Sequence, residues 1–229
     1  MMRTFFLSLE WPLVRALSKW RGQFIHMTKL DLKKERKDLY SPSSSSVSVV
    51  EVPSFKYLMF DGQGAPDGED AQQAYQTLFP ASYKLKFLIK AKGHDYGVMP
   101  LEGLWWADDM DDFVKGRRDR WKWIYMIRQP EFVTPKDFAE VVAILKAKKH
   151  LPGLSELRLE SYKEGRTAQI LHIGPFAAEG PNIQKIHDHI NKIGGAFDGH
   201  KERHHEIYLS DMRKVSPEKM KTVLRQPFH

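Results

Sequence analysis

The sequence of 229 residues contains no cysteine. This absence excludes disulfides, thiolate nucleophiles and cysteine-based zinc sites, and it is consistent with a reducing compartment such as the cytoplasm. The apolar stretch near the N-terminus, residues 5–17, is too short and too often interrupted to span a bilayer, so we expect no membrane insertion. The glycine-rich segment GQGAPDGED lacks the lysine and the spacing of a phosphate-binding loop. We therefore expect no cofactor.

The ten histidines do not show the spacing of a metal site. His187 and His189 are two residues apart on a predicted helix, so they do not share a face. His200, His204 and His205 also lack a zinc-site spacing. The stretch HHEIYLSD, which starts at His204, could belong to a metal site, an acid–base site or the solvent edge of a strand, and we expect no metal.

The charge is unevenly distributed along the chain. Residues 1–40 hold nine Lys/Arg and four Asp/Glu, a net charge of +5, whereas the other 189 residues hold 27 and 25, a net charge of +2. A basic tail can contact nucleic acid or anionic membrane, but we interpret it as solvated and disordered. The folded part gives no reason to expect a nucleic-acid partner. Apolar residues make up 41% and aromatic residues 12% of the chain, which is a globular composition.

The domain organisation follows from these shifts in composition. Residues 1–26 resemble a translated upstream extension, with Met27 as the native start, and the serine run at 41–46 is typical of a flexible linker. We expect residues 1–46 to form a flexible basic extension and linker. Residues 47–229 are expected to form the folded domain, with a first half at 47–150 and a second half at 151–229.

An internal repeat relates these two halves. LMFDGQGAPDGED and ILHIGPFAAEGPN each read as a strand, a glycine turn and a glutamate that opens a helix. Later segments match in the same order and with steadily shorter offsets, as expected if the second copy has shorter loops. The aligned pairs are Gly64 with Gly174, Glu69 with Glu179, Glu102 with Glu206, and Arg128 with Arg225.

Each half is predicted to have the order strand-strand-helix-strand-strand, an α+β arrangement. Pro53 separates the first two strands, and a hairpin turns over Glu164 and Gly165 in the second half. The first helix is interrupted near Pro80, and the helix of the second half ends at Gly194. A further helix begins after a Thr cap at position 134. We expect the two units to pack around a pseudo-twofold axis.

Four segments resemble the GyrI-like small-molecule-binding family over residues 47–229: PLEGLWW, RWKWIYMIRQPEFVT, HIGPFAAEGPNIQKIHDHI and HHEIYLSDMRKVSPEKMKTVLRQP. The resemblance implies duplicated strand-helix-strand-strand halves (SHS2-type) around a central cleft for hydrophobic, often cationic, drug-like molecules. Regulators of the family carry a helix-turn-helix domain, whereas the 46-residue tail is too short and has no such pattern. The chain is more similar to a stand-alone subfamily, of which some members hydrolyse strained cyclopropane-bearing DNA alkylators in an aromatic cage. Phe176 stands where tyrosine is common in the family.

Strand alternation indicates which side chains could meet in that cleft. Glu206 and Tyr208 share one face of their strand, and Glu102 shares a face with Trp106 while Trp105 points the opposite way. In isolation Glu206 and Tyr208 could equally be an exposed strand pair, but the resemblance favours a pocket. Arg128 and Arg225, which each begin an Arg-Gln-Pro segment, are by contrast interpreted as structural.

If these faces meet in the cleft, two carboxylates lie among several aromatic rings, where a carboxylate could neutralise a cationic ligand or act as a general base. The candidate catalytic residues are Glu206 or Glu102 as the base and Tyr208 as a donor, with Tyr125 and His172 as alternative donors. The candidate ligand-binding residues are Trp105, Trp106, Trp123, Tyr125, His172, Phe176 and Glu179. The expected partner of this monomer or weak dimer is a hydrophobic or cationic small molecule. Binding alone is the first hypothesis, and hydrolysis in xenobiotic defence is the alternative.

Overall fold

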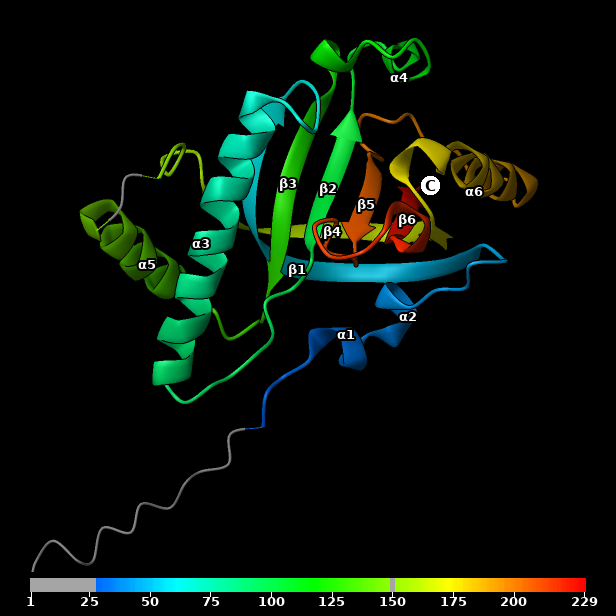
Figure 1. Ribbon diagram of the computed structural model, residues 1–229. Coiled ribbons are helices and arrows are strands. Elements are labelled where there is room, and N and C mark those ends of the chain that lie inside the picture. Colours follow the sequence, from blue (N-terminus) through cyan, green and yellow to red (C-terminus); the bar gives the residue numbers. More distant parts are fainter. Residues whose placement is uncertain (1–27, 149–150) are drawn as a thin grey trace, which may run out of the picture.

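The computed structural model describes residues 28–148 and 151–229, and its centre is a closed antiparallel sheet of six strands (Figure 1). The strands follow the order β1-β3-β2-β5-β6-β4, and β4 pairs again with β1. The apolar residues of the six strands pack inside this sheet and under the helices that cover its outside. The strands are β1 (Ser48–Gln63), β2 (Leu101–Trp106), β3 (Lys122–Gln129), β4 (Arg158–Ile173), β5 (His204–Tyr208) and β6 (Lys221–Pro227).

The helices α3, α5 and α6 lie outside the sheet (Figure 1). α3 packs against β1 and β3, α5 packs against α3, and α6 packs against β4 and β6. No helix in the described ranges is long and apolar enough to cross a membrane. The α-helices are α1 (Leu32–Glu35), α2 (Lys37–Tyr40), α3 (Glu69–Ala91), α4 (Asp111–Val114), α5 (Pro135–Lys148) and α6 (Gly180–Lys192). Short 3₁₀ turns lie at η3 (Arg118–Arg120), η4 (Phe176–Ala178) and η5 (Pro217–Lys219).

β1 and β4 are each one continuous strand of 16 residues, where the sequence predicted two shorter strands. Pro53 lies where β1 pairs with β4 alone, between the paired residues Val52 and Ser54, so its missing N–H interrupts a single position. The predicted hairpin over Glu164 and Gly165 is also wrong. Gly165 pairs with Val52 and keeps its positive φ of 77° inside β4. The long ladder satisfies more backbone groups than a turn would, and glycine tolerates the left-handed conformation.

α3 runs through Pro80 without a break, so the predicted interruption is wrong. Proline removes one backbone hydrogen bond from a helix interior. Here the apolar face of α3 is buried on both sides of Pro80, and this packing outweighs the local cost. The buried apolar residues of α3 are Ala71, Ala74, Leu78, Ala81, Leu85 and Ile89.

The predicted helix ends of α5 and α6 are confirmed. The Thr134 hydroxyl accepts a hydrogen bond from the Asp137 backbone N–H at 3.2 Å. The Asp137 carboxylate in turn accepts from the Thr134 N–H at 2.9 Å, which completes a capping box. α6 ends just before Gly194, whose φ of 75° is a typical helix-terminating conformation.

Residues 28–46 pack against the sheet, where we expected a flexible tail and linker. Asp31 caps α1 by accepting hydrogen bonds from two backbone N–H groups, and Leu32, Leu39 and Tyr40 are buried. In the serine run, the Ser43 carbonyl accepts a hydrogen bond from the Leu171 N–H of β4 at 2.9 Å. A few apolar side chains therefore anchor a segment whose composition reads as polar and flexible. Residues 1–27, including the proposed upstream extension and Met27, lie outside the described residues.

Candidate functional site

The two faces of the closed sheet separate the predicted site residues into two groups. In the ladder between β2 and β5, Gly103 pairs with Glu206, and Glu102 pairs with Ile207. Because side chains alternate along a strand, Glu206 and Tyr208 face outward, toward the helices. Glu102 and Ile207 face the enclosed interior and have no exposed area. The prediction that Glu102 and Glu206 meet in one cleft is therefore wrong.

An aromatic surface covers the outer face of β2, β3 and β5. The Trp105 Nε1–H donates a hydrogen bond to the Tyr208 hydroxyl at 3.1 Å. The Trp105 ring meets Tyr125 edge-on at 5.6 Å between centroids, and Trp123 lies 4.4 Å from Tyr125. Phe176, from η4, meets Tyr208 edge-on at 5.7 Å. We call these five residues the aromatic surface, and all of them are among the predicted site residues.

Exposure increases across the aromatic surface toward α6. Trp123 and Tyr125 are buried, and Tyr75 of α3 lies against Tyr125 with the two hydroxyl groups 2.9 Å apart. Tyr208 is partly exposed, and Phe176 exposes 37% of its area. The buried rings therefore support the surface, while Phe176 and Tyr208 are the rings that a ligand can reach.

Two glycines allow aromatic side chains to approach the strand backbone closely. A Cβ atom at Gly62 would lie 2.0 Å from the Trp123 ring. A Cβ atom at Gly103 would lie 2.9 Å from Trp105 Nε1 and 3.0 Å from the Tyr208 hydroxyl. Both distances are shorter than side chains tolerate without displacement, so these strand glycines mark places where rings approach the backbone closely.

An acidic pair lies beside the exposed rings. Glu179 occupies the N-cap position of α6, but its side chain makes no capping hydrogen bond, and the residue is 5% exposed. Burial, together with the charge of Glu206, raises the pKa of Glu179 to about 9. The carboxyl of Glu179 is therefore protonated at neutral pH, although a helix N-terminus normally favours the charged form.

Glu206 is the second carboxyl group of the acidic pair. Its Oε1 is 3.4 Å from Nε2 of His204, and its side chain is 16% exposed. Burial and the charge of Glu206 raise the pKa of Tyr208 well above its usual range, and a hydrogen bond to Glu206 adds to the effect. The structure thus brings together a reachable carboxylate, a neutral carboxylic acid and a phenol on one face.

His172 has a positioning role in the structure, not the predicted role of ligand donor. Its Nε2 lies 3.1 Å from the Pro175 carbonyl oxygen, and its Nδ1 lies 3.1 Å from the Asn182 amide nitrogen. An Nε2–H group that donates to Pro175, with Nδ1 accepting from the Asn182 amide, satisfies both contacts. Because both nitrogens are engaged, His172 fixes the loop that carries Phe176 and Glu179, and it has no free group for a ligand.

Trp106 is also separated from the other predicted ligand-binding residues. It lies on the opposite face of β2 from Trp105, and the Arg203 guanidinium lies 3.9 Å from the centre of its ring. Trp106 and Arg203 contribute to the wall of an open depression of about 500 Å³ near the start of α3. The assignment of Trp106 to the same cleft as Trp105 is therefore wrong, because adjacent strand residues point to opposite faces.

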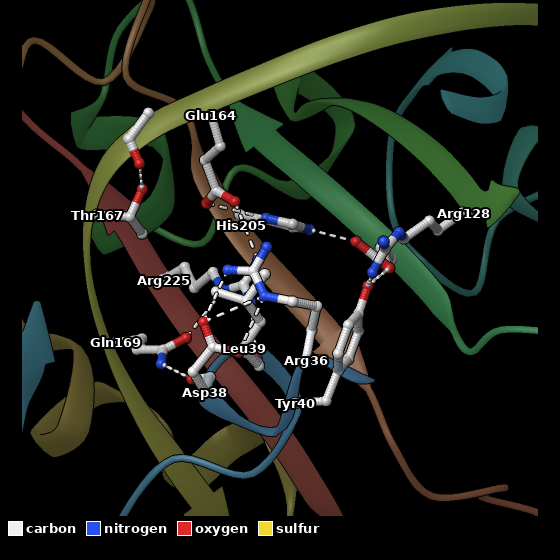
Figure 2. A network of polar contacts seen from close by, with 12 residues as sticks. Arg36, Asp38, Leu39, Tyr40, Arg128, Glu164, Thr167, Gln169, His205 and Arg225 are labelled. Carbon is white, nitrogen blue, oxygen red and sulfur yellow. Dashed lines mark hydrogen bonds and ion pairs between the residues drawn. The ribbon is translucent and has the colours of Figure 1, made fainter. Parts of the chain in front are cut away.

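Glu102 belongs to a buried ionic network inside the sheet, of which Figure 2 labels His205, Glu164 and Arg225. His205 Nε2 lies 3.1 Å from Glu102 Oε2, and His205 Nδ1 lies 3.0 Å from Glu164 Oε1. Arg225 donates from Nη1 to Glu164 Oε2 at 3.0 Å and from Nε to Gln169 Oε1 at 3.1 Å. Each charge thus faces an opposite charge, which is the condition under which ionised groups can be buried. Glu102 is therefore part of a buried ionic network and does not lie on the outer face with Glu206.

Residues from α2 complete this network from the N-terminal side (Figure 2). The Leu39 carbonyl accepts a hydrogen bond from Arg225 Nη2 at 2.7 Å, and the Asp38 carbonyl accepts from Gln169 at 2.6 Å. The Tyr40 hydroxyl lies 3.4 Å from Glu102 and accepts a hydrogen bond from an Arg128 N–H group. The segment before β1 therefore supplies polar partners that the strands alone do not provide.

His205 is expected to make the protein less stable as the pH becomes alkaline. Burial disfavours its charged form, but the charges of Glu164 and Glu102 and the hydrogen bonds to them raise its pKa from 6.5 to about 9. A raised pKa adds stability that is fully present below pH 6.5 and is lost as the pH rises through about 9. We expect the free energy of unfolding, measured by urea titration, to fall by roughly 3 kcal/mol across this window.

Glu179 also contributes a fall in stability with pH, over the wider window from 4.5 to about 9, because its folded pKa is raised. The measurement is therefore made in the Glu179→Gln background. Adding His205→Gln should then remove the remaining slope between pH 6.5 and 9, even if it lowers stability at every pH. An unchanged slope would show that His205 is not the titrating group.

Several residues of both regions were not predicted from the sequence. On the outer face these residues are Tyr75, which supports the aromatic surface, and His204 and Thr222, which lie on its polar side. In the inner network they are Glu164 and Tyr40. For His204 and Thr222 the available signal was strand alternation, since both share the outer face with Glu206 or its neighbours. Glu164 had no such signal, because its glycine neighbour suggested a turn.

Known proteins with a similar sequence and structure define the family. The sequence model of the GyrI-like small-molecule-binding domain matches residues 45–228, so the chain belongs to the GyrI-like family. Comparison with curated proteins gives no match.

Two solved structures from Listeria innocua share substantial sequence identity with this chain. An uncharacterised conserved protein is 37% identical with a TM-score of 0.80, and a protein described as a hydrolase is 36% identical with a TM-score of 0.77. Each comparison covers 88% of this chain and all of the Listeria protein. The C-terminal domain of EcmrR is 10% identical, with a TM-score of 0.51 over 80% of this chain and 97% of that domain, and it shares the fold.

Proposed function

We propose that the protein binds flat hydrophobic or cationic small molecules in a cleft over the aromatic surface, between α3 and α6. The observation that carries the proposal is the position of a reachable carboxylate, Glu206, beside the exposed rings of Phe176 and Tyr208. Membership of a small-molecule-binding family supports the binding of a small molecule. The proposal retains Trp105, Trp123, Tyr125 and Glu179 as parts of the site and assigns no ligand contact to Glu102, Trp106 or His172.

The physical basis of recognition is the combination of ring faces and one negative charge. Apolar contact with a ligand contributes roughly 25 cal/mol per Å² of buried area. An aromatic face attracts a cation by about 0.5–2 kcal/mol, more where water is excluded. Glu206 contacts His204 at 3.4 Å, but none of the described lysine or arginine side chains forms an ion pair with it, so no permanent cation among them competes with a ligand for its charge.

Binding of N-methylphenanthridinium, a flat cation of fixed charge, tests this proposal. We expect Glu206→Gln to weaken binding of this probe about tenfold, because a 1.4 kcal/mol loss corresponds to that factor. Neutral phenanthridine should bind both proteins with similar affinity. Quenching of tryptophan fluorescence gives both dissociation constants. Glu69→Gln, at the exposed start of α3, is the matched control and should bind the cation like the wild type. Equal loss of cation and neutral probe would contradict a charge-specific role for Glu206.

A second candidate function is hydrolysis of strained cyclopropane-bearing alkylators at the same surface. It is supported by the 36% identical Listeria protein described as a hydrolase and by the neighbouring base and phenol, Glu206 and Tyr208. In this reaction water attacks a ring carbon and gives its proton to Glu206. The carbon–carbon bond of the cyclopropane breaks, its electron pair moves to the conjugated carbonyl oxygen, and Tyr208 stabilises that oxygen by hydrogen bonding. Such an activity would serve in defence against xenobiotics.

Following the ring-opened product separates these two functions. If the protein is a hydrolase, product should exceed the protein concentration, and Glu206→Gln should stop turnover while the probe cation still binds, though more weakly. One equivalent of bound alkylator without further product would support binding alone. Turnover that is unchanged in Glu206→Gln would remove this residue from the mechanism.

We also infer that the two halves arose by duplication and are related by a pseudo-twofold axis. Exchange of β1 with β4, β2 with β5 and β3 with β6 leaves the strand order unchanged, which supports this proposal. Under that exchange the inward-facing Glu102 corresponds to an inward-facing residue of β5, such as His205, to which it is hydrogen-bonded. The alignment of Glu102 with Glu206 is therefore one residue out of register.

A further inference from the structure

Three buried polar atoms near Glu206 have no hydrogen-bond partner within the described ranges. They are Oε1 of Glu179 on α6, Oγ1 of Thr222 on β6 and Nε2 of His204 on β5. Thr222 is close enough to Glu179 to lower its pKa slightly, yet neither atom completes a hydrogen bond. An unsatisfied buried polar group costs about 1–3 kcal/mol. His204 Nε2 has the 3.4 Å ion-pair contact with Glu206, so Glu179 Oε1 and Thr222 Oγ1 are the two atoms that point to a polar partner from outside the chain.

The charges that face this region leave Glu179 without a counter-ion. Among the described residues, Glu206 has His204 at 3.4 Å as its ion-pair partner, and Glu179 has none. The other titratable groups nearby are Tyr208 on β5, Tyr125 on β3, Tyr75 on α3, His172 on β4 and His187 on α6. The three phenols are held in the neutral form, because burial raises the pKa of each, and His172 is engaged on both nitrogens. Burial and nearby His204 lower the pKa of His187, which also favours a neutral group.

We propose that Glu179 and Glu206 hold one proton between them in the ligand-free protein, and that a bound cation releases this proton to solvent. The inference deepens the proposed function, since it rests on the same binding surface. Two neighbouring carboxyls without a fixed cation cannot both ionise cheaply, so one keeps its proton. A ligand cation placed between them removes that constraint. The exchange is balanced: one cation enters, one proton leaves, and the charge of the site is unchanged.

This exchange gives the site a pH-dependent selectivity. The protein-bound proton must leave before the cation binds fully, so the affinity for a fixed cation rises about tenfold per pH unit. The rise continues until the pair is ionised without ligand, near the pKa of about 9 of Glu179. A neutral ligand of the same shape exchanges no proton, so its affinity stays level. Selectivity for cations over neutral aromatic compounds therefore increases with pH.

Isothermal titration calorimetry of N-methylphenanthridinium at pH 7, in phosphate and in Tris, measures the proton directly. These buffers differ in ionisation enthalpy, so the difference in observed heat gives the number of protons released. We expect about one proton per bound cation and none for phenanthridine. Binding of the cation with equal heats in both buffers would overturn the proton exchange and leave the proposed binding function intact. No binding of either probe would overturn the proposed function itself.

Variants locate the proton within the pair. Glu179→Gln should abolish proton release and make the affinity for the cation independent of pH between 6 and 8. The control Glu69→Gln changes the exposed glutamate at the start of α3 and should release the proton like the wild type. Full proton release by Glu179→Gln would assign the proton to another group. The two-buffer comparison on the wild type decides the exchange even if a variant folds poorly.

Discussion

A chain that begins at Val47 is expected to lose most of its stability, whereas one that begins at Met27 should melt like the full chain. The truncation removes Leu32, Leu39 and Tyr40 from the core. Loss of one large buried apolar side chain costs about 2–5 kcal/mol, and the whole domain is expected to be stable by only about 5–15 kcal/mol. It also removes the Leu39 carbonyl that accepts a hydrogen bond from the buried Arg225.

Thermal unfolding followed by circular dichroism compares the three chains. The family match begins at residue 45, so a boundary chosen from the sequence alone would remove this segment. If the Val47 chain melts within a few degrees of the full chain, the segment is a dispensable cover and not part of the core. Tyr40→Phe gives a milder comparison, because it keeps the ring and removes only the hydroxyl between Glu102 and Arg128.

Replacement of Arg225 by methionine is expected to destabilise the protein by about 3–5 kcal/mol, because it leaves a buried carboxylate without one of its two cations. Arg225 is 1% exposed, and burial would disfavour its charge if Glu164 did not compensate. The same pair keeps the pKa of Glu164 low: burial would raise it, but the charges of His205 and Arg225 outweigh that effect. Methionine fills much of the volume, so the loss reports charge and hydrogen bonding more than a cavity.

Arg213→Met provides the matched control for this experiment. Arg213 also forms an ion pair with a carboxylate, Asp211 at 2.9 Å, but its side chain is 82% exposed. Exposed pairs contribute at most about 1 kcal/mol, so urea unfolding of this variant should change little. A similarly small effect for Arg225→Met would mean that Glu164 takes up a proton in the variant. Combining Arg225→Met with Glu164→Gln tests this directly, since it should recover part of the lost stability.

The inner network and the aromatic surface share the same strands. On β5, His205 faces inward while Glu206 and His204 face outward, and on β2 the inward Glu102 is followed by the outward Gly103. A slip of one residue between β2 and β5 would exchange the two faces and destroy both regions. Ion pairs inside the sheet penalise such a slip, because every buried charge would lose its partner. The network thus fixes the register on which the outer site depends.

The role of single carboxylates was the least predictable feature. Glu102, Glu164 and Glu206 all lie in β-strands. One faces the helices and two face the interior, and the local pattern does not distinguish a buried ion pair from a ligand site. Glu179 shows the same limit. A helix start normally favours a charged carboxylate, whereas burial beside Glu206 raises the pKa of Glu179 to about 9.

The sequence by itself determined the family, the mixture of helices and antiparallel strands, the shared face of Glu206 and Tyr208 and the capped ends of α5 and α6. These features depend on local periodicity, capping residues and long motifs, all of which can be recognised in the sequence without the tertiary structure. Tertiary structure alone decided that Pro53, Pro80 and Gly165 sit inside continuous elements, that residues 28–46 join the core, and which acids meet which bases. Each of these outcomes depends on packing or charge contacts between segments far apart in the chain, and such contacts outweigh the local preferences that a sequence shows.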